Sequence, residues 1–160
     1  MSKRAILANK WSFERGLMEL CYGIIPIRLH KGFPEVLLVH HCKGSYWGFS
    51  KGHAEKGEEP RKAAARELFE ETGLNVKKFF EYSFSEEYSF ERQRKPIKKS
   101  VQYFVAEVTG EIVIQREEIR EAEWFTLEKA LSIATFSETK TLIEKLKKQL
   151  FHKGFRVKHL

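Results

Sequence analysis

The stretch from Gly52 to Leu74, which reads GHAEKGEEPRKAAARELFEETGL, constrains this chain more than any other part of it. Pro60 suits the first position of a helix, where its missing N–H is not needed. The alanines and charged residues that follow are good helix formers, and Gly73 is the expected stop because a left-handed C-terminal residue costs glycine little. The stretch therefore predicts a loop followed by a helix that begins at Pro60 and ends at Gly73.

Three glutamates of this predicted helix, Glu67, Glu70 and Glu71, are spaced i, i+3 and i+4 and so project from one face. Unpaired like charges this close weaken a helix, whereas magnesium binds a few carboxylates together with water and phosphate oxygens. Ala63 and Ala64 are expected to leave open space above the acids. The opposite side is expected to pack on a core through Ala65, Leu68, Phe69 and Thr72. A solvated acidic face explains the three glutamates alone equally well.

The complete pattern is more specific than the three acids. It consists of a glycine, five further residues, a glutamate, seven further residues and then Arg-Glu-Leu-Phe-Glu-Glu-Thr-Gly-Leu. This pattern resembles the signature box of the Nudix hydrolases at every specified position. The resemblance implies an α/β fold, the family's α/β/α sandwich with a mixed sheet, in which the box forms a loop–helix–loop motif. It also implies a reaction in which Mg²⁺, with Mn²⁺ as the alternative, and an attacking water cleave a nucleoside diphosphate linked to another group.

Length and charge set further bounds. The 160 residues fit one domain over 1–160, with an N-terminal extension over 1–18 and a basic tail over 151–160. The formal net charge of +7 favours anionic partners, either polyphosphates or RNA. Cys21 and Cys42 have no CxxC spacing and fit free thiols in a reducing compartment. With no apolar run long enough for a membrane span and no evident signal peptide, we expect a cytoplasmic protein without a membrane partner, and we favour a monomer.

Strand-like and helix-like segments surround the box. Strands are expected over 19–29, 35–41, 76–90, 101–108 and 122–126, with a further short strand at 111–115. A basic loop is expected over 91–99. A short helix is expected from 126 or 127 to 134, and a final helix, N-capped by Ser137, shows its periodicity over 140–150. These elements predict a mixed sheet with helices on its faces.

The resemblance assigns roles to the box residues. The implied metal ligands on the helix are Glu67, Glu70 and Glu71. Glu67 and Glu71 are the implied direct ligands, and one of the three glutamates is a candidate to accept the proton of the water. The backbone carbonyl of Lys51, just before the box glycine, is a further implied ligand. Arg66 and Glu58 match positions that support the helix and loop through an ion pair.

Many Nudix enzymes add a carboxylate from a distant loop. Glu117 and Glu118 precede Trp124 and are the candidates here, and we favour Glu118. An exposed loop acid that binds no metal is the alternative.

Segments outside the box are similar to the asymmetric diadenosine tetraphosphate hydrolases, a group within this family. These segments are WGFSKGHAEKG at 47–57, RKPIKKSVQYFVAEV at 94–108 and EAEWFTLEKALSIATF at 121–136. The similarity runs from about Tyr22 to Leu146. It implies cleavage of diadenosine tetraphosphate, a small-molecule dinucleoside polyphosphate, to ATP and AMP.

A substrate with four phosphates needs several cations, and its adenine suits aromatic faces. The phosphate contacts implied by position are Lys51, His53 and Lys99, with Arg94, Lys95 and Lys98 as further cations. Tyr88 and Phe136 match positions that sandwich the base, Tyr103 matches a position near phosphate or base, and Trp47 is a further substrate-binding candidate within the similar segment. Packing within the sheet or between helices is the alternative for these rings.

Two departures from this group bear on substrate preference. Ser50 stands where the group usually has proline before Lys-Gly-His, and a serine frees one backbone angle, which is expected to loosen the loop that carries the Lys51 carbonyl. The extension before Cys21 is also longer than the core of the group needs.

Two other functions stay open. A Nudix pyrophosphohydrolase acting on 5′-triphosphorylated RNA is supported by the net charge and by Lys153, Arg156 and Lys158 of the basic tail, although a solvated tail explains the same charges. A non-catalytic nucleotide-binding module is the third class, and the three intact glutamates of the box argue against it.

Overall fold

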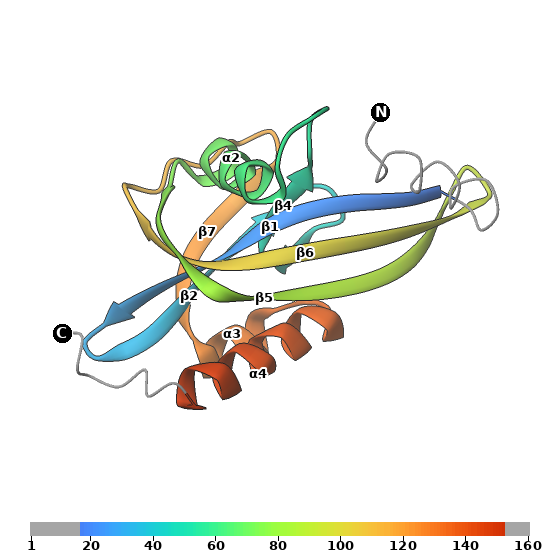
Figure 1. The fold of residues 1–160 in the computed structure, drawn as a ribbon. Coiled ribbons are helices and arrows are strands. Elements are labelled where there is room, and N and C mark those ends of the chain that lie inside the picture. The colour runs from blue at the N-terminus through green and yellow to red at the C-terminus, as the bar shows by residue number, and fades with distance from the viewer. Residues whose placement is uncertain (1–16, 153–160) are drawn as a thin grey trace.

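A mixed seven-stranded sheet is the centre of the computed structural model, which describes residues 17–152 (Figure 1). The strands are β1 (Leu17–His30), β2 (Phe33–His41), β3 (Tyr46–Gly48), β4 (Ser50–His53), β5 (Asn75–Arg92), β6 (Lys95–Thr109) and β7 (Ile119–Thr126). The helices are α2 (Pro60–Thr72), α3 (Leu127–Ile133) and α4 (Ser137–His152). The main path of the sheet is β3–β2–β1–β6–β5, with β4 paired to β1 and β7 to β2. β1 and β6 run parallel, and the other pairs are antiparallel.

Both faces of the sheet are covered, α2 lying on one and α3 and α4 on the other (Figure 1). The apolar run of β2 shows why, since successive side chains of a strand point to opposite faces. Leu37 belongs to the cluster that includes Leu68 of α2, whereas Val36 and Leu38 belong to the cluster that includes Leu146 of α4. This arrangement confirms the predicted α/β/α sandwich.

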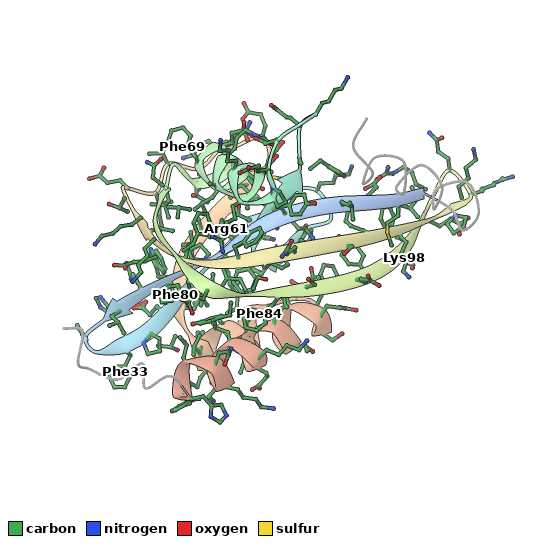
Figure 2. The ribbon with its side chains drawn as sticks, viewed as in Figure 1. Phe33, Arg61, Phe69, Phe80, Phe84 and Lys98 are labelled. Atoms are coloured by element: carbon green, nitrogen blue, oxygen red, sulfur yellow. The ribbon has the colours of Figure 1, made fainter. Side chains whose placement is uncertain are left out.

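Helix α2 has the predicted bounds but a different buried face. It begins at Pro60, and Gly73 ends it in the left-handed conformation with φ 76°. The buried residues are Ala63, Ala64, Leu68, Glu71 and Thr72. The prediction that Ala63 and Ala64 leave open space was wrong, because these small side chains pack at 0% exposure. Phe69 was also predicted wrongly, since it lies on the outer side of α2 at 54% exposure (Figure 2).

Two connections differ from the sequence prediction. The expected loop over 91–99 is a tight hairpin between β5 and β6, in which Gln93 and Arg94 have φ values of 51° and 62°. Positive φ at both positions suits the twist of paired strands, but Asn-Gly is the usual sequence signal for such a turn. The expected short strand at 111–115 pairs with none of the strands between residues 17 and 152. Its backbone donates hydrogen bonds to the end of α2, from Val113 N to Thr72 O at 2.8 Å and from Gln115 N to Glu71 O at 3.1 Å.

The two predicted terminal extensions lie mostly outside the described residues. Leu17 and Met18 begin β1, and Phe151 and His152 end α4. The remaining positions of both extensions, which include Lys153, Arg156 and Lys158, fall outside 17–152. Over the range that is described, no helix is long and apolar enough to cross a membrane.

Candidate active site

A cleft of about 1150 Å³ opens beside the α2 carboxylates, at the strand ends and the N-terminal end of α4. The predicted site residues that line it are Lys51, His53, Glu67, Glu71, Tyr88, Lys99, Tyr103, Glu118 and Phe136, and Glu117 lines it too. Four predicted site residues are not among its lining residues: Trp47, Glu58, Arg66 and Glu70. The structure thus brings together residues from β4, α2, β5, β6 and two loops.

Close approach of β4 to α2 explains the glycine that opens the box. A Cβ atom on Gly52 would overlap the carboxylate of Glu67. Any other residue at this position would displace the Glu67 carboxylate from its place beside the loop, so glycine leaves the space that this carboxylate occupies.

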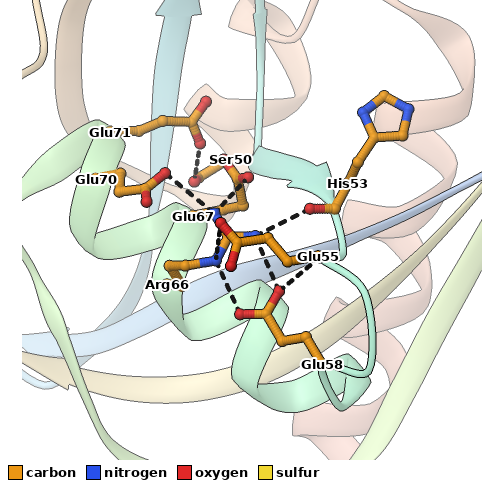
Figure 3. A network of polar contacts seen from close by, with 8 residues as sticks. All are labelled: Ser50, His53, Glu55, Glu58, Arg66, Glu67, Glu70 and Glu71. Atoms are coloured by element: carbon orange, nitrogen blue, oxygen red, sulfur yellow. Dashed lines mark hydrogen bonds and ion pairs between the residues drawn. The ribbon is translucent and has the colours of Figure 1, made fainter.

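Arg66 organises the rim of the site, as Figure 3 shows. Its Nε and Nη2 donate to the two oxygens of Glu58 at 2.8 and 3.0 Å, and Nη2 also donates to the His53 carbonyl at 3.0 Å. Its Nη1 donates to Glu67 Oε1 at 3.0 Å and to Glu70 Oε2 at 3.2 Å. The guanidinium therefore ties the loop to the helix and offsets part of the repulsion between the glutamates.

These contacts shift the pKa values of the partners in opposite directions. The hydrogen bonds from Arg66, and one from the Glu55 backbone N–H, lower the pKa of Glu58 to about 2. The Glu58 carboxylate in turn raises the pKa of Arg66. Both groups stay ionised at neutral pH, so this link between loop and helix persists across the ordinary pH range.

Glu71 is the most deeply buried acid of the site, at 3% exposure. The Ser50 hydroxyl donates a hydrogen bond to Oε2, and the Lys51 backbone also bonds the carboxylate. Burial first, and then the charges of Glu67 and Glu118, raise the pKa of Glu71 to about 8 against the opposing effect of those hydrogen bonds. Ser50, where a looser loop was expected, is itself buried at 2% exposure and bound to Glu71.

His41 completes the surroundings of Glu71. Its Nε2 lies 3.1 Å from the Phe49 carbonyl, which only accepts hydrogen bonds, so this nitrogen carries the proton. Burial lowers the pKa of His41 to about 4, and the ring is neutral at pH 7. Its unprotonated Nδ1 therefore faces Glu71 Oε1 at 4.0 Å. The sequence prediction did not include His41, because only the tertiary structure brings the end of β2 next to α2.

The donor set fits a hard divalent cation. Glu67, Glu71 and Glu118 supply carboxylate oxygens, and burial, followed by the charges of neighbouring glutamates, raises the pKa values of Glu67 and Glu71. Within residues 17–152, no three His, Cys, Asp or Glu side chains are already arranged around one point as metal ligands. Oxygen donors that repel one another in a partly buried site are what magnesium stabilises when it binds.

Cations gather at the other side of the cleft around Glu19. The Glu19 carboxylate lies 2.7 Å from Arg92 Nη1, 3.2 Å from His53 Nε2 and 3.7 Å from Lys99 Nζ. Burial alone would raise the pKa of Glu19, but the hydrogen bonds from Arg92 and His53 and the charge of Lys99 lower it overall. Glu19 and Arg92 were absent from the sequence prediction, since strands far apart in sequence bring them together.

The aromatic candidates lie in different environments. Phe136 is 48% exposed, and its ring centroid is 5.1 Å from that of Tyr46, which the sequence analysis missed. Tyr88 is half-buried and accepts a hydrogen bond from Lys51 Nζ at 3.1 Å. Tyr103 is 2% exposed and packs edge-on against Phe49.

Trp47 lies apart from the cleft. Its ring stacks on His40 at 5.0 Å and meets Phe125 edge-on at 5.7 Å, beside the core on the α4 side of the sheet. The structure therefore does not bring Trp47 together with the other candidate substrate-binding residues.

The fold and the box geometry define the class of protein. The chain belongs to the NUDIX domain family, whose model matches residues 20–146. It is 33% identical over 133 residues to the asymmetrical bis(5′-nucleosyl)-tetraphosphatase of Mus musculus, a match that covers 81% of this chain and 88% of that protein. It is 36% identical over 105 residues to mRNA-decapping enzyme subunit 2 of Arabidopsis thaliana, a match that covers 64% of this chain but only 27% of the relative.

A solved structure agrees with this placement. The crystal structure of the C. elegans Ap4A hydrolase aligns with a TM-score of 0.66 and 28% identity, covering 84% of this chain and 99% of that one. The chain is thus similar to proteins whose names point to different substrates.

Proposed function

We propose that this chain hydrolyses diadenosine tetraphosphate to ATP and AMP with bound Mg²⁺. One observation carries the proposal: the carboxylates of Glu67 and Glu71 open into the same cleft as Lys51, Lys99 and the half-exposed ring of Phe136. Acids for a metal, cations for phosphates and an aromatic face for a base are what such a substrate requires. The mouse relative, named an asymmetrical bis(5′-nucleosyl)-tetraphosphatase, and the C. elegans relative, named an Ap4A hydrolase, support the same choice.

In the reaction, a water oxygen bonds to phosphorus, the anhydride between the first and second phosphates breaks, and the water gives up a proton. Bound Mg²⁺ would neutralise phosphate oxygens and lower the pKa of a water. The proposed metal ligands are the carboxylates of Glu67, Glu71 and Glu118 and the Lys51 carbonyl. Glu70, at the rim of the cleft, is the third predicted helix ligand. A carboxylate of this set accepts the proton from the water.

Arg66 and Glu58 act by positioning. Their ion pair joins the loop to the helix, and the same guanidinium contacts Glu67 and Glu70. It thereby keeps the acids in place without touching the phosphates.

On the opposite side of the cleft, Lys51, His53 and Lys99 contact the phosphate chain. Glu19 contacts His53 and Lys99, so it holds these two side chains side by side in the free protein. We assign Tyr88 and Phe136 to the base and leave Trp47 out of the site, because it packs beside the core. Tyr103 is too buried to stack on a base and instead supports the cleft wall.

The deciding experiment is product analysis. The purified chain is incubated with Mg²⁺ and diadenosine tetraphosphate, and the nucleotides are separated by chromatography. Equal amounts of ATP and AMP, absent with a Glu71→Gln variant, are expected. Two ADP per substrate would place the attack at the central anhydride and contradict the proposal, as would a lack of turnover.

A second candidate is pyrophosphate release from 5′-triphosphorylated RNA. It is favoured by the exposed cations Arg94, Lys95 and Lys98 at the end of the β5–β6 hairpin, which continues from cleft residues Arg92 and Lys99, and by the Arabidopsis relative. If RNA is the substrate, pyrophosphate is released from triphosphorylated RNA, and binding weakens steeply with added salt. RNA binding that is absent at low salt would rule this candidate out.

We also place the enzyme in the cytoplasm. Its two cysteines are free, Cys21 being buried, which suits a reducing compartment.

A further inference from the structure

Glu86 on β5 is a buried acid that the proposed reaction does not use. Its side chain is nine-tenths buried, at 9% exposure, and lines the cleft. The Tyr103 hydroxyl donates to Glu86 Oε1 at 3.2 Å. The other oxygen, Oε2, is buried and has no hydrogen-bond partner among the described residues. A buried acceptor without a partner opposes folding, so such an atom calls for an explanation.

No cation of the cleft satisfies this oxygen. Lys51 is near enough for its charge to act on Glu86, but its Nζ donates to the Tyr88 hydroxyl and lies between the rings of Tyr46 and Tyr88, 5.6 and 5.2 Å from their centroids. Glu138, whose charge also acts on Glu86, is itself an acid and supplies no N–H donor. The free protein therefore holds an acceptor for which the side chains of residues 17–152 supply no donor.

The neighbourhood of Glu86 indicates what kind of donor fits. The cleft around it is lined by Tyr46, Tyr88 and Phe136, and aromatic faces of this kind stack on nucleobases. Among the groups of a nucleotide, an exocyclic amino group is a neutral donor that lies in the plane of such a base. Burial of this donor against an unpaired carboxylate oxygen would satisfy both atoms.

We propose that Glu86 determines base specificity by accepting a hydrogen bond at Oε2 from the 6-amino group of a substrate adenine. The inference deepens the proposed function, on which it rests, by naming the residue that selects the base. Adenine suits a single free acceptor, whereas guanine presents adjacent N1–H and 2-amino donors that pair best with both oxygens of a carboxylate, and Tyr103 already engages Oε1. A 6-oxo base such as hypoxanthine places an acceptor against the carboxylate and is disfavoured.

The test compares diadenosine tetraphosphate with diinosine tetraphosphate. The first carries a 6-amino group and an unprotonated N1, and the second carries a 6-oxo group and an N1–H. The wild-type chain is expected to prefer adenine about tenfold or more in kcat/KM, equivalent to about 1.4 kcal/mol or more. Glu86→Gln supplies an amide N–H that donates to a 6-oxo group, so the preference should shrink or reverse, chiefly through KM. Glu87→Gln, at the neighbouring exposed position, is the matched control and should leave the preference unchanged.

A structural role for Glu86 predicts a different result, namely equal losses on both substrates with an unaltered ratio, and that outcome would overturn the proposal. Equal activity of the wild type on both substrates would overturn it as well, even if the variant does not fold. Equilibrium binding of ATP and ITP by calorimetry separates this inference from the proposed function. A preference for ATP that Glu86→Gln removes would support base selection even if diadenosine tetraphosphate is not hydrolysed, whereas equal affinities would refute it.

Discussion

Helices α2 and α4 cover opposite faces of the same sheet, but they bury different kinds of residue. Helix α4 buries Leu142, Ile143, Leu146 and Leu150, whereas α2 buries two alanines, Leu68, Glu71 and Thr72. Large aliphatic side chains stabilise the fold by about 1.5–3 kcal/mol each when they leave water, and a buried carboxyl group opposes folding unless it is protonated or paired. One helix therefore serves stability and the other gives up stability to hold an acid in the site.

The difference also shows in how each helix is held. The α4 side relies on apolar contact with the sheet, including Phe84, which lies between β5 and α4 (Figure 2). The α2 side relies on directed polar contacts, in which Arg66 reaches the loop and Ser50 reaches Glu71. Substitutions in the two helices should therefore affect different measurable quantities.

The largest expected effect is on turnover. Glu71→Gln removes the charge of a proposed metal ligand while keeping the size of the side chain, so kcat should fall by several orders of magnitude, with the fold intact by circular dichroism. Glu144→Gln, at an exposed position of α4, is the matched control and should keep normal kcat. Near-normal turnover of Glu71→Gln would contradict the assignment of Glu71 as a metal ligand.

The counterpart in α4 should affect stability instead. Leu146 is 0% exposed, and Leu146→Ala should lower the free energy of unfolding by about 2–5 kcal/mol because it deletes buried methyl groups and leaves a cavity. Urea denaturation measures this loss, and kcat per folded molecule should stay unchanged. A loss of kcat at full stability would mean that α4 takes part in catalysis.

The pH dependence of stability should distinguish the buried acid from the buried aliphatic residues. The pKa of Glu71 rises from about 4.3 in an unfolded chain to about 8 in the fold, so the folded state holds this proton more tightly. This contribution is complete below about pH 4.3 and is lost as the pH rises towards 8.

The measurement is denaturation without divalent metal at pH 5 and pH 8. The wild-type chain should lose a few kcal/mol relative to Glu71→Gln over this range, and added Mg²⁺ should restore much of that loss at pH 8. Parallel pH profiles of the two proteins would show that Glu71 ionises in the fold as it does in water.

The smallest effect concerns the residue that holds the acid. Ser50→Ala removes the hydroxyl that donates to Glu71, and metal affinity should fall by about 10–100-fold, as is usual when a partner of a metal ligand is lost. Binding of Mn²⁺, followed by electron paramagnetic resonance, measures this directly. Ser132→Ala removes a comparable hydroxyl on α3 and should leave Mn²⁺ affinity unchanged. Equal affinities for wild type and Ser50→Ala would show that the serine acts only through the backbone.

Local patterns in the sequence predicted much of this protein. The bounds of α2, its stop at Gly73 and the burial of the sheet on both faces follow from residues near one another in the chain, where propensity and periodicity act. The grouping of Glu67 with Glu71 was predicted from their spacing on one helix, whereas the pairing of Arg66 with Glu58 was predicted from the resemblance of the box to the Nudix signature.

Contacts between distant segments were decided only by the tertiary structure. Nothing in the local sequence shows that Phe69 faces outward, that Trp47 packs away from the cleft, or that Gln93 and Arg94 form a tight turn. Likewise, Ser50 and His41 meet Glu71, Arg92 meets Glu19, and Tyr103 meets Glu86 through strands and helices far apart in the chain. Period and propensity describe a segment in isolation, whereas the burial of a carboxylate and the partner it finds depend on which other segments the fold places beside it.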